Sequence, residues 1–275
     1  MGGGEEQGML LGRPTPVVDS YSPGLLYPIP RAAGRALISC DAGLPFRGFD
    51  LWHAYEISWL DADGKPQVRV GRVSIPAISP NLVESKSFKL YLNSLNNTRF
   101  ASEARVAATI RRDIASVVGT DIELELFEID DASLCGRPLP GLCLDSLALE
   151  VSGDAPPAGE MLLRVPGEVR QEQLHTHLLR SLCPVTGQPD WASVWIHYRG
   201  DALDHSSLLR YIIAYRHHQE FHEQCVERMF CDIQQRIAPE FLHIQAFYTR
   251  RGGLDINPFR STDPATRPLP RLNRQ

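Results

Sequence analysis

The stretch Ser102-Glu-Ala-Arg-Val-Ala-Ala-Thr-Ile-Arg-Arg-Asp-Ile-Ala-Ser-Val-Val-Gly119 decides the fold class of this chain. Ser102 suits an N-cap and Gly119 suits a helix end, so the stretch predicts one helix. Its apolar residues recur at helical spacing and predict one buried face: Val106, Ile110, Ile114 and Val117. The next segment, Ile122-Glu-Leu-Glu-Leu-Phe-Glu128, alternates apolar and charged residues as a half-buried strand does. A helix followed by an alternating strand indicates an α+β protein.

The segment before this helix predicts an antiparallel hairpin. Residues 55–60 and 68–75 alternate between apolar and polar side chains, as two half-buried strands do. Asp61-Ala-Asp-Gly64 between them is typical of a turn. The first module therefore combines an antiparallel sheet with a helix.

The second half of the chain repeats this order of elements. Residues 193–198 predict a strand, residues 220–237 predict a helix that Pro239 ends, and residues 241–248 predict a closing strand. Gly- and Pro-rich breaks at 135–141 and 155–159 place a linker between the halves. We therefore expect a first module over 1–130 with a leading arm of about twenty residues, a linker over 131–160 and a second module over 161–275.

The two halves also align as diverged copies. Five residues of the first half match five of the second at an offset of about 120: Ser87, Tyr91, Phe100, Asp113 and Ile114 with Ser207, Tyr211, Phe221, Asp232 and Ile233. The first copy alone holds Glu84-Ser-Lys86, and the second alone holds His222-Glu223, where the first has Ala101-Ser102. Each half keeps residues that the other lost, which predicts one active site assembled from both modules.

Composition excludes several classes of function. The chain has 275 residues, 43% hydrophobic and 22% charged, as ordinary globular proteins have. Its net charge of −5 argues against direct binding of nucleic acid, which requires a basic face. No apolar stretch approaches membrane-spanning length. Six cysteines are too sparse for a disulfide scaffold, and the acidic start lacks the pattern of a signal peptide. We therefore expect a cytoplasmic protein without a membrane segment.

The loop Cys183-Pro-Val-Thr-Gly-Gln-Pro-Asp190 combines a thiol and a carboxyl group on either side of a turn. Pro184 disfavours helical geometry at Cys183, and Thr186-Gly187 with Pro189 is typical of a tight turn. We expect Cys183 to be partly exposed and reactive, with Asp190 close enough to donate a proton. Taken alone, the loop is also consistent with a surface turn that carries an incidental thiol.

Three further segments accompany this loop: Glu84-Ser-Lys-Ser-Phe-Lys89, Phe221-His-Glu-Gln-Cys225 and Arg251-Gly-Gly-Leu-Asp-Ile-Asn-Pro-Phe-Arg260. In this order, the four motifs resemble the long, two-module form of the NADPH-dependent 7-cyano-7-deazaguanine reductases, the nitrile reductases of queuosine biosynthesis. The resemblance runs from Leu11-Gly-Arg to Phe259. It implies tandem tunnelling-fold modules, a homodimer, a free deazapurine nitrile as substrate and NADPH as cofactor.

The resemblance also implies roles for particular residues. Cys183 would add to the nitrile as a thioimide-forming nucleophile and Asp190 would supply the proton. Five residues would bind the substrate: Val83, Glu84, Ser85, His222 and Glu223. Four would bind the cofactor: Ser85, Lys86, Arg251 and Gly252, with Lys86 and Arg251 in opposite halves of the sequence. No G-x-G-x-x-G follows a strand, so the residues themselves do not indicate a dinucleotide site.

The residues leave simpler readings open. Glu223 also suits the positive end of a helix dipole, and Glu84 also suits a solvated position at a strand end. His222 and Cys225 lie three apart and could bind zinc with Cys183 or Cys231, which would suggest a zinc-dependent cyclohydrolase acting on a purine or pterin. Cys225 equally suits the apolar helix face, so we expect no metal. A non-catalytic purine-binding module is the third alternative, and it predicts binding without turnover.

Overall fold

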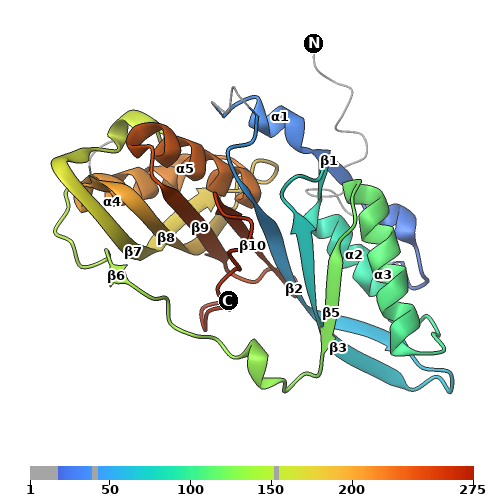
Figure 1. Ribbon diagram of the computed structural model, residues 1–275. Coiled ribbons are helices and arrows are strands. Elements are labelled where there is room, and N and C mark those ends of the chain that lie inside the picture. Colours follow the sequence, from blue (N-terminus) through green and yellow to red (C-terminus); the bar gives the residue numbers. More distant parts are fainter. Residues whose placement is uncertain (1–17, 39–42, 152–154) are drawn as a thin grey trace, which may run out of the picture. The chain divides into compact units, whose positions relative to one another are not determined.

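The computed structural model describes residues 18–38, 43–151 and 155–275 and divides into two compact units (Figure 1). The first unit contains residues up to 33, 51–133 and 250–255, and the second contains 34–50, 134–249 and 256–275. Residues 34–50, which we expected in the first module, thus belong to the second unit. Residues 250–255, which we expected in the second module, belong to the first unit. Most of the expected N-terminal arm lies outside the described residues. No helix in the described ranges is long and apolar enough to cross a membrane.

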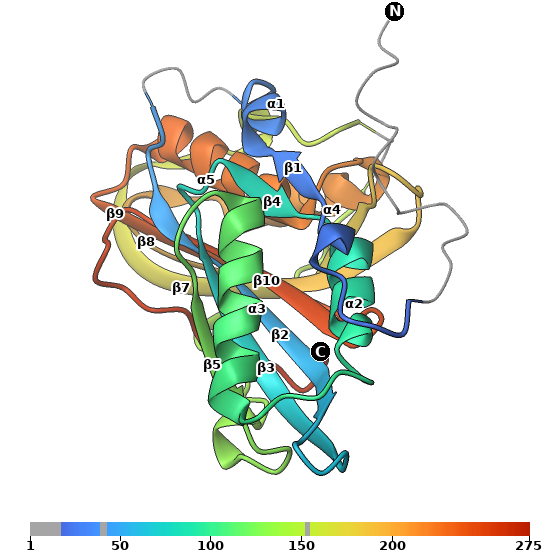
Figure 2. The ribbon, with the colours of Figure 1, turned by 90° about the vertical axis from the view of Figure 1, so that its right-hand side faces the viewer.

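The first unit combines a sheet with two helices on one face of it (Figures 1 and 2). Its strand order is β5-β3-β2, and β3 runs antiparallel to β5 from Val70↔Phe127 to Ser74↔Glu123. A separate two-stranded sheet pairs β1 with β4. The elements are β1 (Pro28–Pro30), β2 (Arg47–Leu60), β3 (Pro66–Pro76), β4 (Asn81–Val83), β5 (Glu123–Phe127), α2 (Ser85–Ser94) and α3 (Glu103–Val118). The hairpin and the strand predicted around residue 125 are confirmed.

Helix α3 forms where the sequence predicts it. The Ser102 hydroxyl accepts a hydrogen bond from the backbone N–H of Arg105, and Gly119 ends the helix in the left-handed conformation with φ 77°. The predicted apolar face is buried at Val106, Ile110 and Ile114, but its last buried member is Val118 and not Val117.

The second unit has strand order β10-β9-β8-β7-β6, with α4 and α5 along one face of β7, β8 and β9 (Figure 1). Strand β8 runs antiparallel to β7 and β9, whereas the short β6 runs parallel to β7. The elements are β6 (Leu142–Cys143), β7 (Arg164–Leu182), β8 (Pro189–Leu203), α4 (His205–Ile213), α5 (His222–Ile237), β9 (Phe241–Tyr248) and β10 (Leu254–Ser261). The remaining helical elements are α1 (Arg31–Arg35) and four 3-10 turns: Pro23–Leu25, Ala132–Leu134, Gly159–Met161 and Ala214–His217.

A small hydrogen-bond network anchors helix α2 in the first unit. The backbone N–H of Tyr27 donates to the Ser87 hydroxyl at 3.0 Å, and the N–H of Glu84 donates to the Tyr27 carbonyl at 2.9 Å. The Ser87 hydroxyl donates to the Glu84 carbonyl at 2.7 Å. One helical turn after Ser87, the Tyr91 hydroxyl donates to the Asp113 carboxylate of α3 at 2.7 Å, so a buried polar contact joins α2 and α3.

The second unit builds the same network around α4. The N–H of Leu163 donates to the Ser207 hydroxyl at 3.0 Å, the N–H of Asp204 donates to the Leu163 carbonyl at 2.9 Å, and the Ser207 hydroxyl donates to the Asp204 carbonyl at 2.8 Å. The Tyr211 hydroxyl donates to Asp232 of α5 at 2.5 Å. Because the same contacts recur at matched positions, the structure supports the tandem repeat that the sequence predicts.

The network corrects one part of the predicted alignment. The N–H of Phe100 donates to the Leu60 carbonyl at 2.8 Å, and the N–H of Glu220 donates to the Leu182 carbonyl at 3.3 Å. Phe100 therefore corresponds to Glu220, and the match to Phe221 is wrong by one position. Helix α3 begins at residue 103 and helix α5 begins at residue 222, so His222 corresponds to Glu103. The predicted match of His222 to Ala101 is therefore wrong.

The end of the fourth motif is structural. Arg260 is fully buried, and its Nη2 lies 2.8 Å from both an Asp50 and a Glu227 carboxylate oxygen. Arg35 also pairs with Glu227, at 2.7 Å. Two cations and two carboxylates compensate one another, as buried charges require.

Candidate active site

The hairpin between β7 and β8 positions Cys183. Its N–H donates to the Gln188 carbonyl at 2.9 Å, and the Gly187 N–H donates to the Cys183 carbonyl at 2.9 Å. Gly187 sits at φ 68°, a conformation that favours glycine in a tight turn. The turn is therefore as predicted. The expected partial exposure is wrong, because Cys183 retains only 3% of its accessible surface.

Asp190 lies on the same face of this hairpin as Cys183. It pairs directly with Ser181 across the two strands, and Cys183 is two residues beyond Ser181, so strand alternation points both side chains to one side. Asp190 is 4% exposed, and its Oδ2 lies 3.0 Å from Nε2 of the buried His222. The face that carries Cys183 and Asp190 is therefore the one covered by α5.

His222 and Glu223 form the first turn of α5, and both are buried. The His222 ring stacks on Tyr248 of β9 with 3.7 Å between ring centroids and 11° between planes. Burial raises the pKa of the Tyr248 phenol well above its ordinary value, so this ring stays neutral. The stack fixes the imidazole with Nε2 directed at Asp190. Nε2 of His222 and Oδ2 of Asp190 lie 3.0 Å apart in this arrangement.

Cys225 does not take part in the zinc site that the sequence left open. Burial raises the pKa of its thiol far above the ordinary value, which opposes the thiolate that a metal needs. Within the described ranges, His222 and Cys225 do not belong to a group of three residues with metal-ligand spacing. Cys225 instead fills the buried apolar face of α5.

The second set of predicted residues lies in the first unit, where β4 leads into α2. Val83 is buried at the end of β4, and Glu84 follows as the N-cap of α2. Its two carboxylate oxygens accept the N–H groups of Lys86 and Ser87, each at 2.7 Å. Glu84 is 1% exposed, so the solvated alternative is wrong. Burial raises the pKa of this carboxyl group, against the opposing effect of its two N–H donors.

A turn of the same unit presents Arg251 and Gly252. The N–H of Arg251 donates to the Leu254 carbonyl at 2.8 Å, and Gly252 adopts φ 58°. This left-handed conformation favours glycine, and a Cβ atom on Gly252 would displace the flexible end of the Lys89 side chain, whose Cδ would lie 2.8 Å away. Arg251 and Lys86 both act on the Glu84 carboxyl group electrostatically, and both favour its charged form. Arg251 thus groups with Lys86 in one unit, although the two lie far apart in the sequence.

Three residues that the sequence did not single out hold this turn in place. Asp255 accepts hydrogen bonds from the Tyr55 hydroxyl at 2.5 Å and contacts Nδ1 of His53 at 2.8 Å, and all three are buried. The Tyr55 N–H also donates to the Gly253 carbonyl at 2.9 Å. Aromatic and acidic residues at alternating strand positions gave no signal beyond that of an ordinary strand. Their contacts depend on a segment about two hundred residues later.

Two family models match separate parts of this chain. Residues 17–126 match a family model described as nitrile reductase, 7-cyano-7-deazaguanine-reductase N-term, and residues 189–266 match one described as QueF-like protein. The chain is similar to the NADPH-dependent 7-cyano-7-deazaguanine reductase of Chromohalobacter salexigens, with 52% identity over 96% of both chains. It is equally similar to the enzyme of that name from Dechloromonas aromatica, with 52% identity over 92% of this chain and 89% of the relative.

A solved structure of an archaeosine synthase QueF-Like in the apo form also aligns. The alignment covers 37% of this chain and 92% of that one, with 16% identity and a TM-score of 0.29. A likeness at this level supports no conclusion about function.

Proposed function

This chain belongs to the family of NADPH-dependent 7-cyano-7-deazaguanine reductases, and on that premise we propose that it reduces the nitrile of 7-cyano-7-deazaguanine to the primary amine of 7-aminomethyl-7-deazaguanine, a step of queuosine biosynthesis. The observation that carries the proposal is the arrangement around Cys183. A buried thiol shares one face of the sheet with a buried Asp190–His222 pair. This arrangement supplies a nucleophile and a proton on the same side of a substrate.

In the proposed reaction, Cys183 Sγ forms a bond to the nitrile carbon. The carbon–nitrogen triple bond becomes a double bond, and its nitrogen takes one proton, which gives a thioimide. The thiol loses one proton in the same step, so the Asp190–His222 pair can accept that proton and return it without a net change. Covalent addition replaces one difficult reduction by easier ones. Two molecules of NADPH, bound in turn, would each supply one hydride, and with two protons these hydrides would complete the reduction and release Cys183 as the thiol.

Recognition of the deazaguanine ring requires a carboxylate that accepts from a ring N–H and the exocyclic amine. We assign this role to Glu223, which is buried in the first turn of α5 beside His222. Glu84 is the second candidate, with Val83 and Ser85 beside it in the chain. Its two oxygens each accept one backbone N–H, and a carboxylate has capacity for about four hydrogen bonds, so it can also accept from a ligand.

The residues of the first unit fit a phosphate-bearing cofactor such as NADPH. Lys86, Lys89 and Arg251 bring three cations to the start of α2 and the adjoining turn, and Ser85 offers a hydroxyl there. Gly252 has no side chain of its own, and the side chain of Lys89 lies beside it. We propose that Ser85, Lys86, Arg251 and Gly252 hold the phosphate groups, whose negative charge these cations complement.

We also infer a cytoplasmic homodimer. The inference depends on the resemblance of the chain to the long form of the family. Light scattering on the purified protein tests the dimer, because it should return twice the mass of one chain. A single-chain mass at working concentration would contradict it.

The decisive experiment is a reaction with 7-cyano-7-deazaguanine and NADPH. We expect two molecules of NADPH to be oxidised for each nitrile consumed, and mass spectrometry should detect the aminomethyl product. Cys183→Ala should abolish turnover while the base still binds, and the matched control Cys225→Ala should keep the chemistry. Turnover by the Cys183 variant would exclude the covalent mechanism. Binding of the base by the native protein without NADPH oxidation would favour the purine-binding module.

A further inference from the structure

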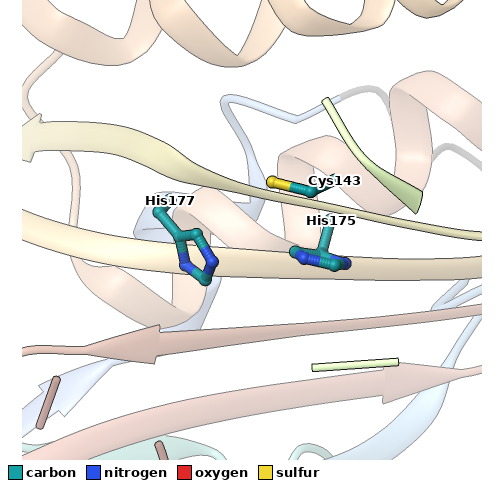
Figure 3. Close-up of side chains that lie close together, drawn as sticks. All are labelled: Cys143, His175 and His177. Carbon is teal, nitrogen blue, oxygen red and sulfur yellow. The ribbon is translucent and has the colours of Figure 1, made fainter. Parts of the chain in front are cut away.

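A second cluster of reactive side chains lies in the second unit, and the proposed reaction does not use it. Among the residues that the structure describes, Cys143, His175 and His177 alone form a group of three with metal-ligand spacing. Their candidate ligand atoms all lie within 4.8 Å of one another. Figure 3 shows the Cys143 sulfur over the space between the two imidazole rings, whose centroids are 5.4 Å apart.

The backbone brings the three residues together. His175 and His177 are two apart in β7, and Cys143 in β6 pairs in parallel register with His175. The N–H of Leu144 donates to the His175 carbonyl at 2.9 Å, which fixes β6 along β7. Gly141, at φ 89°, precedes β6, and any Cβ atom there would collide with the Gln173 carbonyl. Glycine at this position therefore permits the close approach that places Cys143.

The hydrogen bonds of the two rings orient them as metal ligands. Nδ1 of His175 lies 3.1 Å from the Pro140 carbonyl, which can only accept, so this nitrogen carries the proton. Nδ1 of His177 lies 2.7 Å from the Ser193 hydroxyl. Both rings therefore use Nδ1 for the protein and keep Nε2 as the ligand nitrogen, the arrangement that supports metal-bound histidine.

Asp145 supports the same cluster from the side. Its Oδ1 accepts the Thr176 hydroxyl at 2.5 Å and the His177 N–H at 3.1 Å. These two hydrogen bonds fix strand β7 at Thr176 and His177. The half-exposed thiol of Cys143 and the exposed ring of His177 leave the cluster open to solvent, which gives an ion a way in.

We propose that Cys143, His175 and His177 bind one Zn²⁺ ion, with water as the fourth ligand. One sulfur and two imidazole nitrogens are the donors that zinc prefers, and a three-residue set leaves one tetrahedral position for water. The ion links β6, the edge strand inside the expected linker region, to its neighbour β7. Its role is to stabilise the second unit.

The test uses full-length protein without a histidine tag, reduced and then dialysed against Zn²⁺. We expect one equivalent of zinc by elemental analysis and a rise of about 5 °C or more in the melting temperature. With Co²⁺ in place of zinc, a thiolate-to-metal absorption band should appear. Cys143→Ser should remove that band, and His177→Asn should weaken metal binding by more than the 10- to 100-fold expected for loss of a supporting contact.

Cys135→Ser is the matched control, because Cys135 is another free cysteine of the same unit. It should keep the metal, the band and the melting temperature. Circular dichroism and nitrile reduction confirm that each variant is folded, since none of these residues belongs to the proposed active site. Substoichiometric zinc in the native protein, or unchanged binding in both Cys143→Ser and His177→Asn, would overturn the proposal.

Discussion

Replacing Glu84 by glutamine tests whether this residue both caps helix α2 and binds the nitrile base. Its two oxygens accept the N–H groups of Lys86 and Ser87 at 2.7 Å in a buried cap. Glutamine keeps one acceptor and turns an NH₂ group toward the other donor, so one buried N–H loses its partner. That loss costs about 1–3 kcal/mol of unfolding free energy. With a urea m-value of about 2 kcal/mol/M, the unfolding midpoint should fall by roughly 0.5–1.5 M.

Asp204→Asn provides the matched control. Asp204 caps α4 as Glu84 caps α2, but its Oδ1 accepts only the Ser207 N–H, at 2.7 Å. Asparagine keeps that acceptor and is itself a good N-cap, so the expected loss is below about 0.5 kcal/mol. Only the Glu84 variant should also weaken binding of the nitrile base, which isothermal titration measures. Equal losses of stability in both variants would refute the two-donor argument.

The raised pKa of Glu84 predicts how the difference in stability between the native protein and Glu84→Gln changes with pH. Burial raises the pKa of Glu84 in the folded protein above its ordinary 4.5, so the folded state binds the proton more tightly than the unfolded chain. The stability that this group contributes is complete below about pH 4.5 and is lost as pH rises through the folded pKa. Glutamine does not titrate. The stability gap between the native protein and Glu84→Gln should therefore narrow with rising pH, and a widening gap would show that the N–H donors outweigh burial.

Three further variants test the proposed site. Asp190→Asn should capture the nitrile covalently only slowly and should lower turnover by about 10²- to 10⁴-fold, because the proposed addition passes the thiol proton through this residue. Asp201→Asn in the same strand should change neither. Normal turnover in the Asp190 variant would assign the proton to another group. Arg251→Ala should raise the Michaelis constant for NADPH by about tenfold or more and leave adduct formation intact, with Arg111→Ala as the control. An unchanged constant would remove that residue from the cofactor site. Glu223→Gln should weaken binding of the base by about 1–3 kcal/mol, and an unaltered dissociation constant would place it outside the pocket.

The elements that the sequence predicts well are those with local signals. Helix α3 has a serine cap, an unbroken apolar face and a terminal glycine, and its observed bounds match within a residue. Strand β9 alternates little but is short, apolar and preceded by Pro239, and it spans the predicted 241–248. In both cases the neighbours in the chain carry the information, so no knowledge of distant contacts is needed.

Strand β7 shows where this reasoning fails. Its 19 residues are mostly polar or charged in the first half, and its pairing with β8 shifts register after Arg164 and again after Thr176. Such shifts destroy the period of two on which strand prediction depends. The strand forms because β8 pairs with it along its length, and that long-range pairing leaves no mark in the local sequence.

The candidate site also has some features that the local sequence predicts and others that it does not. The turn at Cys183 is predicted by its own prolines and glycine, and the resemblance identifies the residues that matter. The burial of Cys183, the stack of His222 on Tyr248 and the grouping of Arg251 with Lys86 all depend on segments far apart in the sequence. The resemblance predicts the chemistry, whereas the exposure and the partners of these residues depend on the three-dimensional structure.

The contribution of residues 250–255 to the first unit has a consequence for biosynthesis. Asp255 lies 202 residues after His53, so their hydrogen bond cannot form until nearly the whole chain has left the ribosome. At about 5–20 residues per second, that interval lasts roughly 10–40 s. The N-terminal half therefore emerges before the turn that carries Arg251 and Gly252 has been synthesised. A nascent chain stalled before residue 250 should show higher protease sensitivity around β2 than one released after residue 261.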